Sequence, residues 1–427
     1  MNKLIILLLA CAIACKQSET KFYMPAEFET QEAVWFGWET NPDFHPVIAE
    51  VIKGLMPTVK IKVAADSDSL LSVSKKILAG FSIDTTKILF YSMKGERYWI
   101  RDHGAAFLVN DKGDLGVADF EWSLYGIEGW YQQKYNNNAD SVEKYINKYL
   151  NKSTGDVDSL MAVAEKATII KSGIVIEGGA IEVNGKGTLI LCEAVALQRN
   201  PGKTKPELEE EFKKTLGVAH IIWLKEGLID DAHIRQIHFK KYATLGTGGH
   251  TDEFVRFADA STILLAWVEE SEIDKHPFNK ENFDRMSENL HILEQATDQD
   301  GNPFKIIKVP LPDPIERKIL VKEKLDSTDW INVTPRFYIT RDAPMVGDTL
   351  LNVAASSYMN YLVSNDVIIL PTYTKPGSSP EKEKQVSEIM KSAFPNHKQI
   401  WVECMPLNWD GGGIHCSTQQ QPKRKSK

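Results

Sequence analysis

Short runs of β-branched and aromatic residues alternate along the chain with segments of amphipathic helical periodicity. This alternation predicts an α/β protein. The expected strands are 33–38, 59–64, 87–91, 168–176, 188–191, 220–224, 262–268, 305–309, 336–340, 367–370 and 399–402. The expected helices are 46–55, 67–78, 140–150, 206–216, 281–296 and 380–393. Because no Gly/Ser-rich linker interrupts residues 23–422, we expect a single domain there, followed by a short basic tail at 423–427.

The N-terminus has the pattern of an export signal. A short basic start at Met1–Lys3 precedes an apolar run, Leu4–Ala10, that is too short to anchor a protein across a bilayer. Small residues then lead to Cys15, and a polar stretch follows, which resembles a bacterial lipoprotein signal. We therefore expect residues 1–14 to be a signal peptide, Cys15 to carry the lipid and 15–22 to be a tether. The mature protein would be exported and held at a membrane only by this lipid; an ordinary signal peptide is the alternative.

Charge and cysteine content narrow the classes of function. The 427 residues include 50 Lys+Arg and 58 Asp+Glu, a formal net charge of -8, which argues against nucleic acid as a partner and favours a cationic ligand. Apart from Cys15, the mature chain keeps Cys192, Cys404 and Cys416, which is not a disulfide framework. An unpaired thiol in an exported protein is open to oxidation, so a catalytic role would explain why one is retained.

Four local patterns contain the candidate chemical groups. They are Trp99–Gly104, Glu177–Ile181, Gly248–Asp252 and Gly411–Pro422. In each, an acidic residue, a histidine or a cysteine stands beside glycines or aromatic residues, where a strand ends and the backbone can approach a ligand.

The acidic residues of these patterns are evenly spaced. Asp102 and Glu177 lie 75 residues apart, and so do Glu177 and Asp252. Residues 23–422 contain a little over five such periods. The spacing therefore suggests about five similar modules whose equivalent strand ends converge on one centre.

Together with Met24–Glu29 and Ala33–Trp38, the four patterns resemble the agmatine deiminase and Porphyromonas-type peptidyl-arginine deiminase family. The most specific part is Gly411–Pro422, which reads GGGIHCSTQQQP, and the resemblance covers essentially residues 23–422, including 355–360 and 365–371. It implies a pentein, the five-bladed pseudo-symmetric α/β-propeller of the guanidino-group-modifying superfamily, with one catalytic domain. It implies hydrolysis of a guanidino substrate without a cofactor or metal.

The residues present suit this chemistry. A guanidinium is planar, cationic and poorly electrophilic, so its hydrolysis needs carboxylates that bind its N–H groups, a nucleophile and a proton donor for ammonia. We expect Asp102 and Asp252 to bind the guanidinium while the Cys416 thiolate attacks its carbon to form a covalent amidino intermediate. His250 would protonate the ammonia and then activate water. Glu177 is expected to contact His250 or the pocket, favouring an imidazolium that keeps Cys416 ionised.

Five further residues are expected near the substrate: Trp99, Arg101, Trp122, Glu253 and Gly412. A strand over 250–253 would place His250 and Asp252 on one face and Glu253 on the other. If that strand bends, the charge of Glu253 would instead lie near the far end of the substrate. It would then favour a distal ammonium over a distal carboxylate.

Several alternatives remain open. His250, Asp252, His415 and Cys416 could hold zinc, but adjacent His415 and Cys416 would point in opposite directions on an extended chain, which leaves His415 a packing or supporting role. Cys404 and Cys416 could form a disulfide. The tryptophans at 35, 38, 122 and 130 suit the core or a pocket wall better than a cation cage. A lipid-anchored protein that only binds cations is the non-enzyme alternative.

Departures from the family pattern leave the substrate open. They are His103–Ala106 after the Arg-Asp pair, the altered stretch Trp122–Gly126, Glu253 in place of a common Asn, and an extra segment, Ile229–Gly246. We expect agmatine to be hydrolysed to N-carbamoylputrescine and ammonia, with peptidyl-arginine conversion to citrulline as the second reading. Export favours the second reading, whereas the sequence His250–Phe254 is closer to the agmatine branch.

Overall fold

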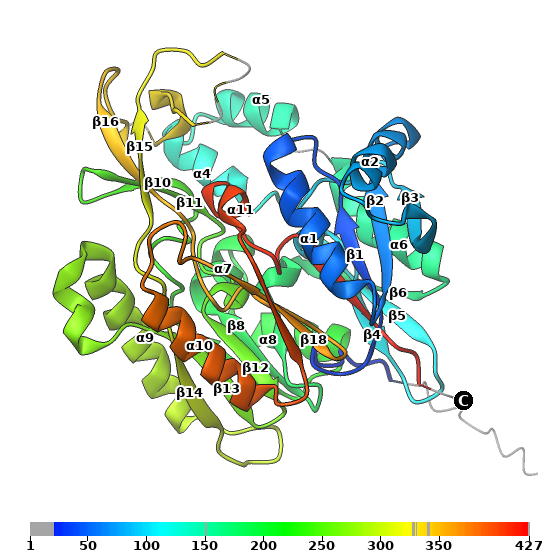
Figure 1. The fold of residues 1–427 in the computed structure, drawn as a ribbon. Helices are drawn as coiled ribbons and strands as arrows, with labels where there is room; N and C mark the ends of the chain where they lie inside the picture. The colour runs from blue at the N-terminus through cyan, green and yellow to red at the C-terminus, as the bar shows by residue number, and fades with distance from the viewer. Residues whose placement is uncertain (1–20, 150–151, 327–328, 330, 340–341, 426–427) are drawn as a thin grey trace, which may run out of the picture.

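The structure, a computed structural model, describes residues 21–149, 152–326, 329, 331–339 and 342–425 (Figure 1). The predicted signal peptide, lipidated Cys15 and most of the tether lie outside these residues. Within them, no helix is both long enough and apolar enough to cross a membrane.

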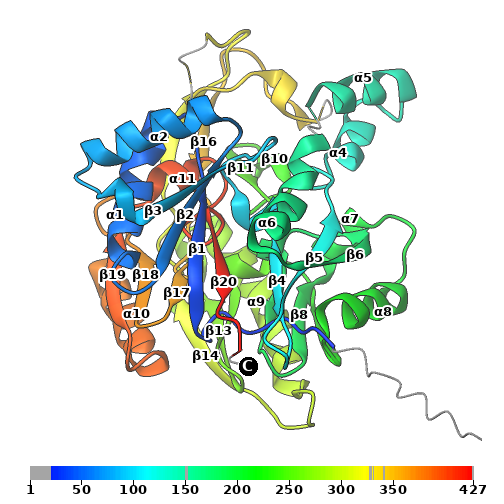
Figure 2. The same cartoon turned by 90° about the vertical axis from the view of Figure 1, so that its right-hand side faces the viewer.

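The described strands form six small sheets, and helices connect many of them, so the α/β prediction is confirmed (Figures 1 and 2). Five sheets are β20-β1-β2-β3, β4-β5-β6, β7-β8-β9, β12-β13-β14 and β17-β18-β19. Their strands are β1 Gln31–Gly37, β2 Lys60–Ala65, β3 Ile88–Ser92, β4 Ala106–Val109, β5 Leu115–Glu121, β6 Thr168–Val175, β7 Glu182–Val183, β8 Thr188–Cys192, β9 His220–Leu224, β12 Val255–Asp259, β13 Thr262–Trp267, β14 Lys305–Pro310, β17 Leu362–Ser364, β18 Val367–Pro371, β19 Lys398–Val402 and β20 Thr418–Pro422.

These five sheets share one connectivity. A first strand pairs antiparallel with a second, and the second pairs parallel with a third after a helical crossover. In the N-terminal sheet the first strand is β20, from the far end of the chain, which lies beside β1 (Figure 2). The helices are α1 His45–Leu55, α2 Asp68–Gly80, α3 Ile100–His103, α4 Ile127–Lys134, α5 Ala139–Tyr149, α6 Val157–Glu165, α7 Glu193–Arg199, α8 Lys205–Leu216, α9 Pro277–Gln295, α10 Pro380–Ala393 and α11 Met405–Trp409.

This shared connectivity explains the 75-residue spacing. Asp102 lies just before β4, Glu177 just before β7 and Asp252 just before β12, each before the first strand of its sheet. Cys416 has the same place before β20, and Asn360 has it before β17. The spacing therefore reports the position of a residue within a repeated unit.

The segment 229–246 contributes to the sixth sheet, which interrupts the repeat. Its strands β10 Ile234–His238 and β11 Tyr242–Gly246 join β16 Thr349–Val353 and β15 Glu316–Leu320. The chain between β14 and β17 also contains the expected strand 336–340, which was wrong. Pro335 begins a 3₁₀ turn there, because its fixed φ and missing N–H suit a first helical position better than a strand ladder.

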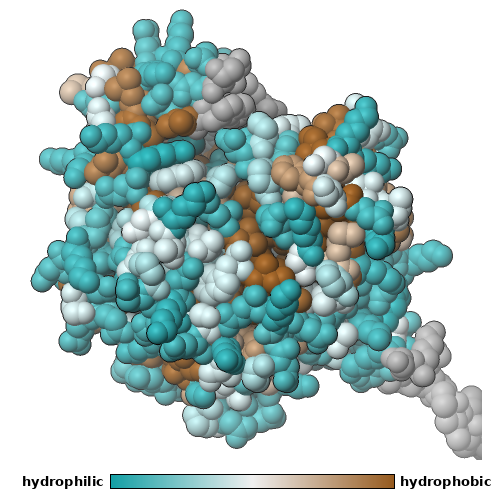
Figure 3. Space-filling model, in the orientation of Figure 1, coloured by the Kyte–Doolittle hydropathy of each residue, from teal (hydrophilic) through white to brown (hydrophobic). Residues whose placement is uncertain are grey.

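Most apolar side chains are buried beneath the helices. The largest hydrophobic cluster spans the sheets from β4 to β18, and a second lies around β1, β2 and α1. Trp35 and Trp38 are fully or almost fully buried, and Trp130, on α4, is buried too, as the sequence predicted for core residues. On the face shown in Figure 3 the surface is mainly hydrophilic, with an apolar strip near its centre.

Arg256, on β12, joins three parts of the fold. Its Nε donates to Glu182 at 3.0 Å, its Nη1 donates to the carbonyls of Met359 and Tyr361 at 3.2 and 3.0 Å, and its Nη2 binds Glu27. Its side chain is 1% exposed. A buried charge that satisfies so many partners fixes their positions, since removing it leaves the opposite charges without compensation.

Substituting Arg256→Met should lower the free energy of unfolding by about 3–5 kcal/mol, because Glu182 and Glu27 would stay buried with less positive charge beside them. Urea unfolding followed by intrinsic fluorescence measures this loss. Lys280→Met is the control, because the Lys280–Asp284 pair is exposed on α9 and should contribute little. Equal midpoints for Arg256→Met and the wild type would contradict the role assigned to Arg256.

Candidate active site

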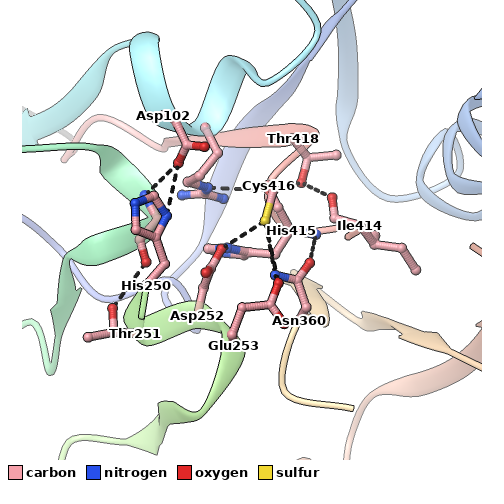
Figure 4. Close-up of polar contacts among 12 residues, drawn as sticks. Asp102, His250, Thr251, Asp252, Glu253, Asn360, Ile414, His415, Cys416 and Thr418 are labelled. Atoms are coloured by element: carbon pink, nitrogen blue, oxygen red, sulfur yellow. Dashed lines mark hydrogen bonds and ion pairs between the residues drawn. The ribbon is translucent and has the colours of Figure 1, made fainter. Parts of the chain in front are cut away.

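Cys416 lies at the centre of the converging strand ends, between α11 and β20 (Figure 4). It is 2% exposed. Its Sγ is 3.4 Å from Asp252 Oδ2, 3.1 Å from Asn360 Nδ2 and 3.8 Å from Glu253 Oε1. A thiol is thus held against acidic groups and one amide donor.

Asp102, at the end of the short helix α3, is held by two donors. Tyr125 Oη donates to its Oδ2 at 2.9 Å, and the Gly179 amide donates to its Oδ1 at 3.1 Å. A Cβ at position 179 would lie 2.7 Å from His250 Nδ1 and 2.8 Å from Asp102 Oδ1. The glycine in the Glu177–Ile181 pattern is therefore required by close approach, as expected for a backbone segment beside a site.

Asp252 belongs to a 3₁₀ helix over Thr251–Glu253, not to the strand that was expected. Its Oδ2 accepts a hydrogen bond from His415 Nδ1 at 2.7 Å, whereas its Oδ1 is buried without a hydrogen-bond partner among the described residues. Burial would raise the pKa of Asp252, but the hydrogen bond and charge of His415 and the charge of His250 outweigh it and lower that pKa. An ionised oxygen is therefore available to a cation.

His250 is surrounded by carboxylates. Its Nε2 lies 3.3 Å from Glu177 Oε2 and its Nδ1 lies 3.5 Å from Asp102 Oδ1. Burial would lower the pKa of His250, but the charges of Asp102, Glu177 and Asp252 raise it to about 9. The structure thus supports the imidazolium expected from the sequence.

Two other residues support His250. The backbone N–H of His250 donates to Asp231 Oδ2 at 3.0 Å, and Asp231 lies in the segment 229–246. Arg199 Nε donates to both oxygens of Glu177, at 2.9 and 3.0 Å. Although burial opposes it, Arg199 and His250 lower the pKa of Glu177 to about 2, so this carboxylate stays charged beside the imidazole.

Glu253 points into the site and not away from it, because the 3₁₀ turn replaces strand alternation. Asn360 Nδ2 donates to its Oε1 at 2.8 Å. Burial, followed by the charges of Asp252, Asp231 and Asp230, raises the pKa of Glu253 well above its usual range. Glu253 therefore holds its proton more strongly than an ordinary carboxyl group does, close to Cys416. The alternative that places its charge near the far end of the substrate stays a prediction.

The surroundings of Cys416 disfavour its thiolate. Burial and then the charges of Asp252, Glu253 and Asp102 raise its pKa well above the usual value. This direction runs against the sequence-based expectation that His250 and Glu177 keep Cys416 ionised, and that expectation stays a prediction.

A cavity of about 100 Å³ opens onto Cys416. It is lined by Trp99, Asp102, Tyr125, Ile234, Leu245, Gly246, Thr247, Asp410, Gly411, Gly412 and Cys416. A Cβ on Gly412 would lie 2.7 Å from the Trp99 ring, so these two predicted substrate-binding residues pack together in its wall. The segment around β10 and β11 closes another side, which gives the inserted residues a place at the site.

Trp122 and Arg101 lie elsewhere than the sequence suggested. Trp122 lines a cavity of about 20 Å³ on another side of Asp102, with His103 and Asp158. The buried guanidinium of Arg101 binds Glu27 Oε1 at 2.9 Å and Gln420. Because Arg101 is cationic and already paired, its contacts are with the protein and not with a second guanidinium.

The structure also bears on the two alternative roles for the cysteines. Cys192, Cys404 and Cys416 are free thiols, so the Cys404–Cys416 disulfide is not formed. Within the described residues, the donor atoms that gather closely are those of Asp252, Glu253 and Cys416. This set differs from the zinc ligands that the sequence left open, because it contains neither histidine.

Three residues at the site were not predicted to have roles. Asn360 contacts Cys416, Tyr125 contacts Asp102, and Glu27 binds His415 Nε2 at 2.8 Å. Asn360 and Glu27 lie in stretches that carried the family resemblance. The 75-residue period missed Asn360, because the chain that carries β15 and β16 lengthens the interval after Asp252.

Comparison with known proteins identifies the family. The model of the Porphyromonas-type peptidyl-arginine deiminase family matches residues 23–422. The chain belongs to this family. The agmatine deiminase of Pseudomonas syringae pv. tomato is 29% identical over 415 residues, covering 94% of this chain and 95% of that protein.

Solved structures agree with this family in fold. An agmatine deiminase of Enterococcus faecalis superposes with a TM-score of 0.71 at 25% identity, over 95% of this chain and 96% of that one. A putative arginine deiminase from Porphyromonas gingivalis has a TM-score of 0.66 at 19% identity, over 94% and 99% of the two chains. Because the second structure is only 19% identical, its likeness concerns the fold alone.

Substituting Glu177→Gln should lower the pKa of His250 by about one unit or more, because a stabilising charge is lost while Arg199 remains. NMR titration of the histidine rings measures this pKa. Glu96→Gln is the control, because Glu96 pairs with His103, and this change should leave the pKa of His250 as it is.

The pKa of His250 in the folded protein, about 9, lies above the usual 6.5, so the stabilisation that His250 provides is complete below about pH 6.5. This stabilisation is lost as the pH rises toward 9. An unchanged pKa of His250 in Glu177→Gln would contradict the role assigned to Glu177.

Proposed function

We propose that the protein is an agmatine deiminase, which hydrolyses agmatine to N-carbamoylputrescine and ammonia. The observation that carries the proposal is the meeting of the Cys416 thiol with Asp102 and Asp252, one of whose oxygens is buried and unpaired. A planar guanidinium can donate to both carboxylates while its carbon lies next to sulfur. The 29% identical agmatine deiminase supports the choice of substrate.

The cationic substrate itself activates the nucleophile. Asp252, Glu253 and Asp102 raise the pKa of Cys416 in the empty site together with burial, so a guanidinium bound between the two aspartates lowers it again. The thiol proton is released to solvent through the cavity that opens onto Cys416, while Asp252 stays ionised and holds the guanidinium. The sulfur then forms a bond to the guanidinium carbon.

His250 donates and accepts the protons of the remaining steps. As an imidazolium it protonates the departing nitrogen, so that the C–N bond breaks, ammonia leaves and an amidino-thioether remains on Cys416. The neutral imidazole then takes a proton from water as its oxygen bonds to the same carbon. The C–S bond breaks to give the ureido product, and the proton of the added hydroxyl returns to sulfur.

Two features of this proposal concern the whole chain. We propose that the five sheets of shared connectivity are the blades of a five-bladed propeller with the site at its centre, over a single domain at 23–422. We also keep the proposal, which rests on the sequence alone, that the chain is exported and lipid-anchored at Cys15.

The proposed reaction is tested by incubating the protein with agmatine, free arginine and a peptide with C-terminal arginine, and assaying the ureido product. Agmatine should give the highest kcat/KM. Cys416→Ser should abolish turnover and the covalent adduct seen by mass spectrometry, while Cys192→Ser, whose thiol faces the Lys225 carbonyl, should retain both. If the peptide has the highest kcat/KM, the substrate is peptidyl-arginine and not agmatine. If Cys416→Ser is active, the proposed mechanism is wrong.

The neutral state of the thiol has its own test. In the free protein at neutral pH, Cys416 should contribute almost no thiolate, because burial and three acidic neighbours raise its pKa. The ultraviolet absorbance of thiolate, taken as wild type minus Cys416→Ser across a pH titration, measures this. A difference signal already complete at pH 7 would show that Cys416 is ionised before substrate arrives.

A further inference from the structure

Asp410 lies between two hollows. It lines the cavity at Cys416 and also a wider groove of about 350 Å³, whose other lining residues include Asn41, Asp43, Phe44, Arg317, Met405 and Trp409. Asp410 follows α11, and Gly411 after it has a φ of +84°, a left-handed conformation that turns the chain toward Cys416. Its carboxylate therefore stands at the opening of the catalytic cavity.

This carboxylate is open to a ligand. Among the residues that the structure describes, no side chain makes a hydrogen bond or an ion pair with it, and Asp410 is exposed to solvent. Although part of the side chain is exposed, the walls of the two hollows desolvate the carboxyl group of Asp410 in part and raise its pKa to about 6, against the charge of Arg235. The group is thus mainly ionised at neutral pH, and the Arg317 guanidinium stacks on Trp409 with its carbon 4.3 Å from the ring centroid.

The other acidic groups of the site are already used. Asp102 and Asp252 flank the thiol, and Glu253 accepts a hydrogen bond from Asn360 beside Cys416, where burial raises its pKa. Asp410 is the remaining carboxylate that lines the catalytic cavity besides Asp102. Between it and Cys416 the wall offers the Trp99 ring and the apolar side chains of Ile234 and Leu245.

We infer that Asp410 binds the ammonium group at the far end of the substrate and so selects guanidines with a cationic tail. This inference rests on the proposed function, since it assumes that a guanidinium occupies the position between Asp102 and Asp252. The methylene chain would run along the apolar wall, where burial favours it. The ammonium would then form a charge-assisted hydrogen bond with a carboxylate that no side chain of the described residues binds.

The inference is tested by calorimetric binding in a Cys416→Ser background, which holds ligands without turning them over. The probes are agmatine and n-butylguanidine, which has the same four-carbon chain and no ammonium. Cys416→Ser should bind agmatine about tenfold or more tighter than n-butylguanidine, and adding Asp410→Asn should remove most of that preference. Asp43→Asn is the matched control, because Asp43 lines the outer groove but not the catalytic cavity.

Turnover in the otherwise unmodified chain gives a second readout. Asp410→Asn should raise KM for agmatine about tenfold with little change in kcat, and should leave n-butylguanidine kinetics unchanged. Loss of kcat for both substrates would show instead that Asp410 only supports the shape of the site. A preference for agmatine that survives Asp410→Asn, or falls equally in Asp43→Asn, would overturn the inference.

The outcomes for the reaction and for the subsite are separable. If the wild type does not turn over agmatine but Cys416→Ser prefers it through Asp410, the proposed function fails and the ammonium subsite stands. If agmatine is turned over but the preference is absent, the proposed function stands and the subsite fails. If neither guanidine binds, both are wrong.

Discussion

The centre of the molecule holds more carboxylates than burial would ordinarily permit, and the site depends on how their charge is balanced. Glu27 is held ionised by Arg101, His415 and Arg256, and Glu177 by Arg199 and His250. Where such cations are lacking, as at Glu253, burial raises the pKa of the carboxyl. Burial also raises the pKa of Asp102, against the charge of His250, whereas His415 and His250 lower that of Asp252. Asp102 and Asp252, which lie beside Cys416, are the carboxyl groups left for a cationic ligand.

Glu27 connects this balance to the fold. Its carboxylate binds Arg101 from α3, Arg256 from β12 and His415 beside the nucleophile, so three of the repeated units are fixed to one N-terminal residue. His415 also binds Asp252: its other ring nitrogen, Nδ1, lies 2.7 Å from Asp252 Oδ2. His415 thus supports the site as a link between two carboxylates, which a zinc or packing role would not explain.

The α/β class and the convergence of Asp102, Glu177 and Asp252 could be predicted, because each of these residues stands at the same place in a unit whose spacing is visible in the sequence. Cys416 was predicted from the glycine-rich pattern Gly411–Pro422 and the family resemblance. Asn360 could not be found from that spacing, since an insertion precedes it. The conformation around Asp252 and Glu253 was missed for a local reason: strand periodicity was assumed where the chain turns through a 3₁₀ helix. The placement of Arg101 was missed because its partner, Glu27, is 74 residues away.

Ionisation states were the least predictable property, because they depend on the sum of charges from segments that are distant in sequence. An imidazolium at His250 suggested a thiolate at Cys416, yet the nearer carboxylates and burial outweigh it. A buried thiol with a raised pKa beside two aspartates is a site that lacks one positive charge. A bound guanidinium supplies it, so that binding the correct charge and activating sulfur become one event. A neutral molecule of similar shape would fill the cavity without lowering the pKa of the thiol, and selection for a cation is therefore built into the chemistry as well as into binding.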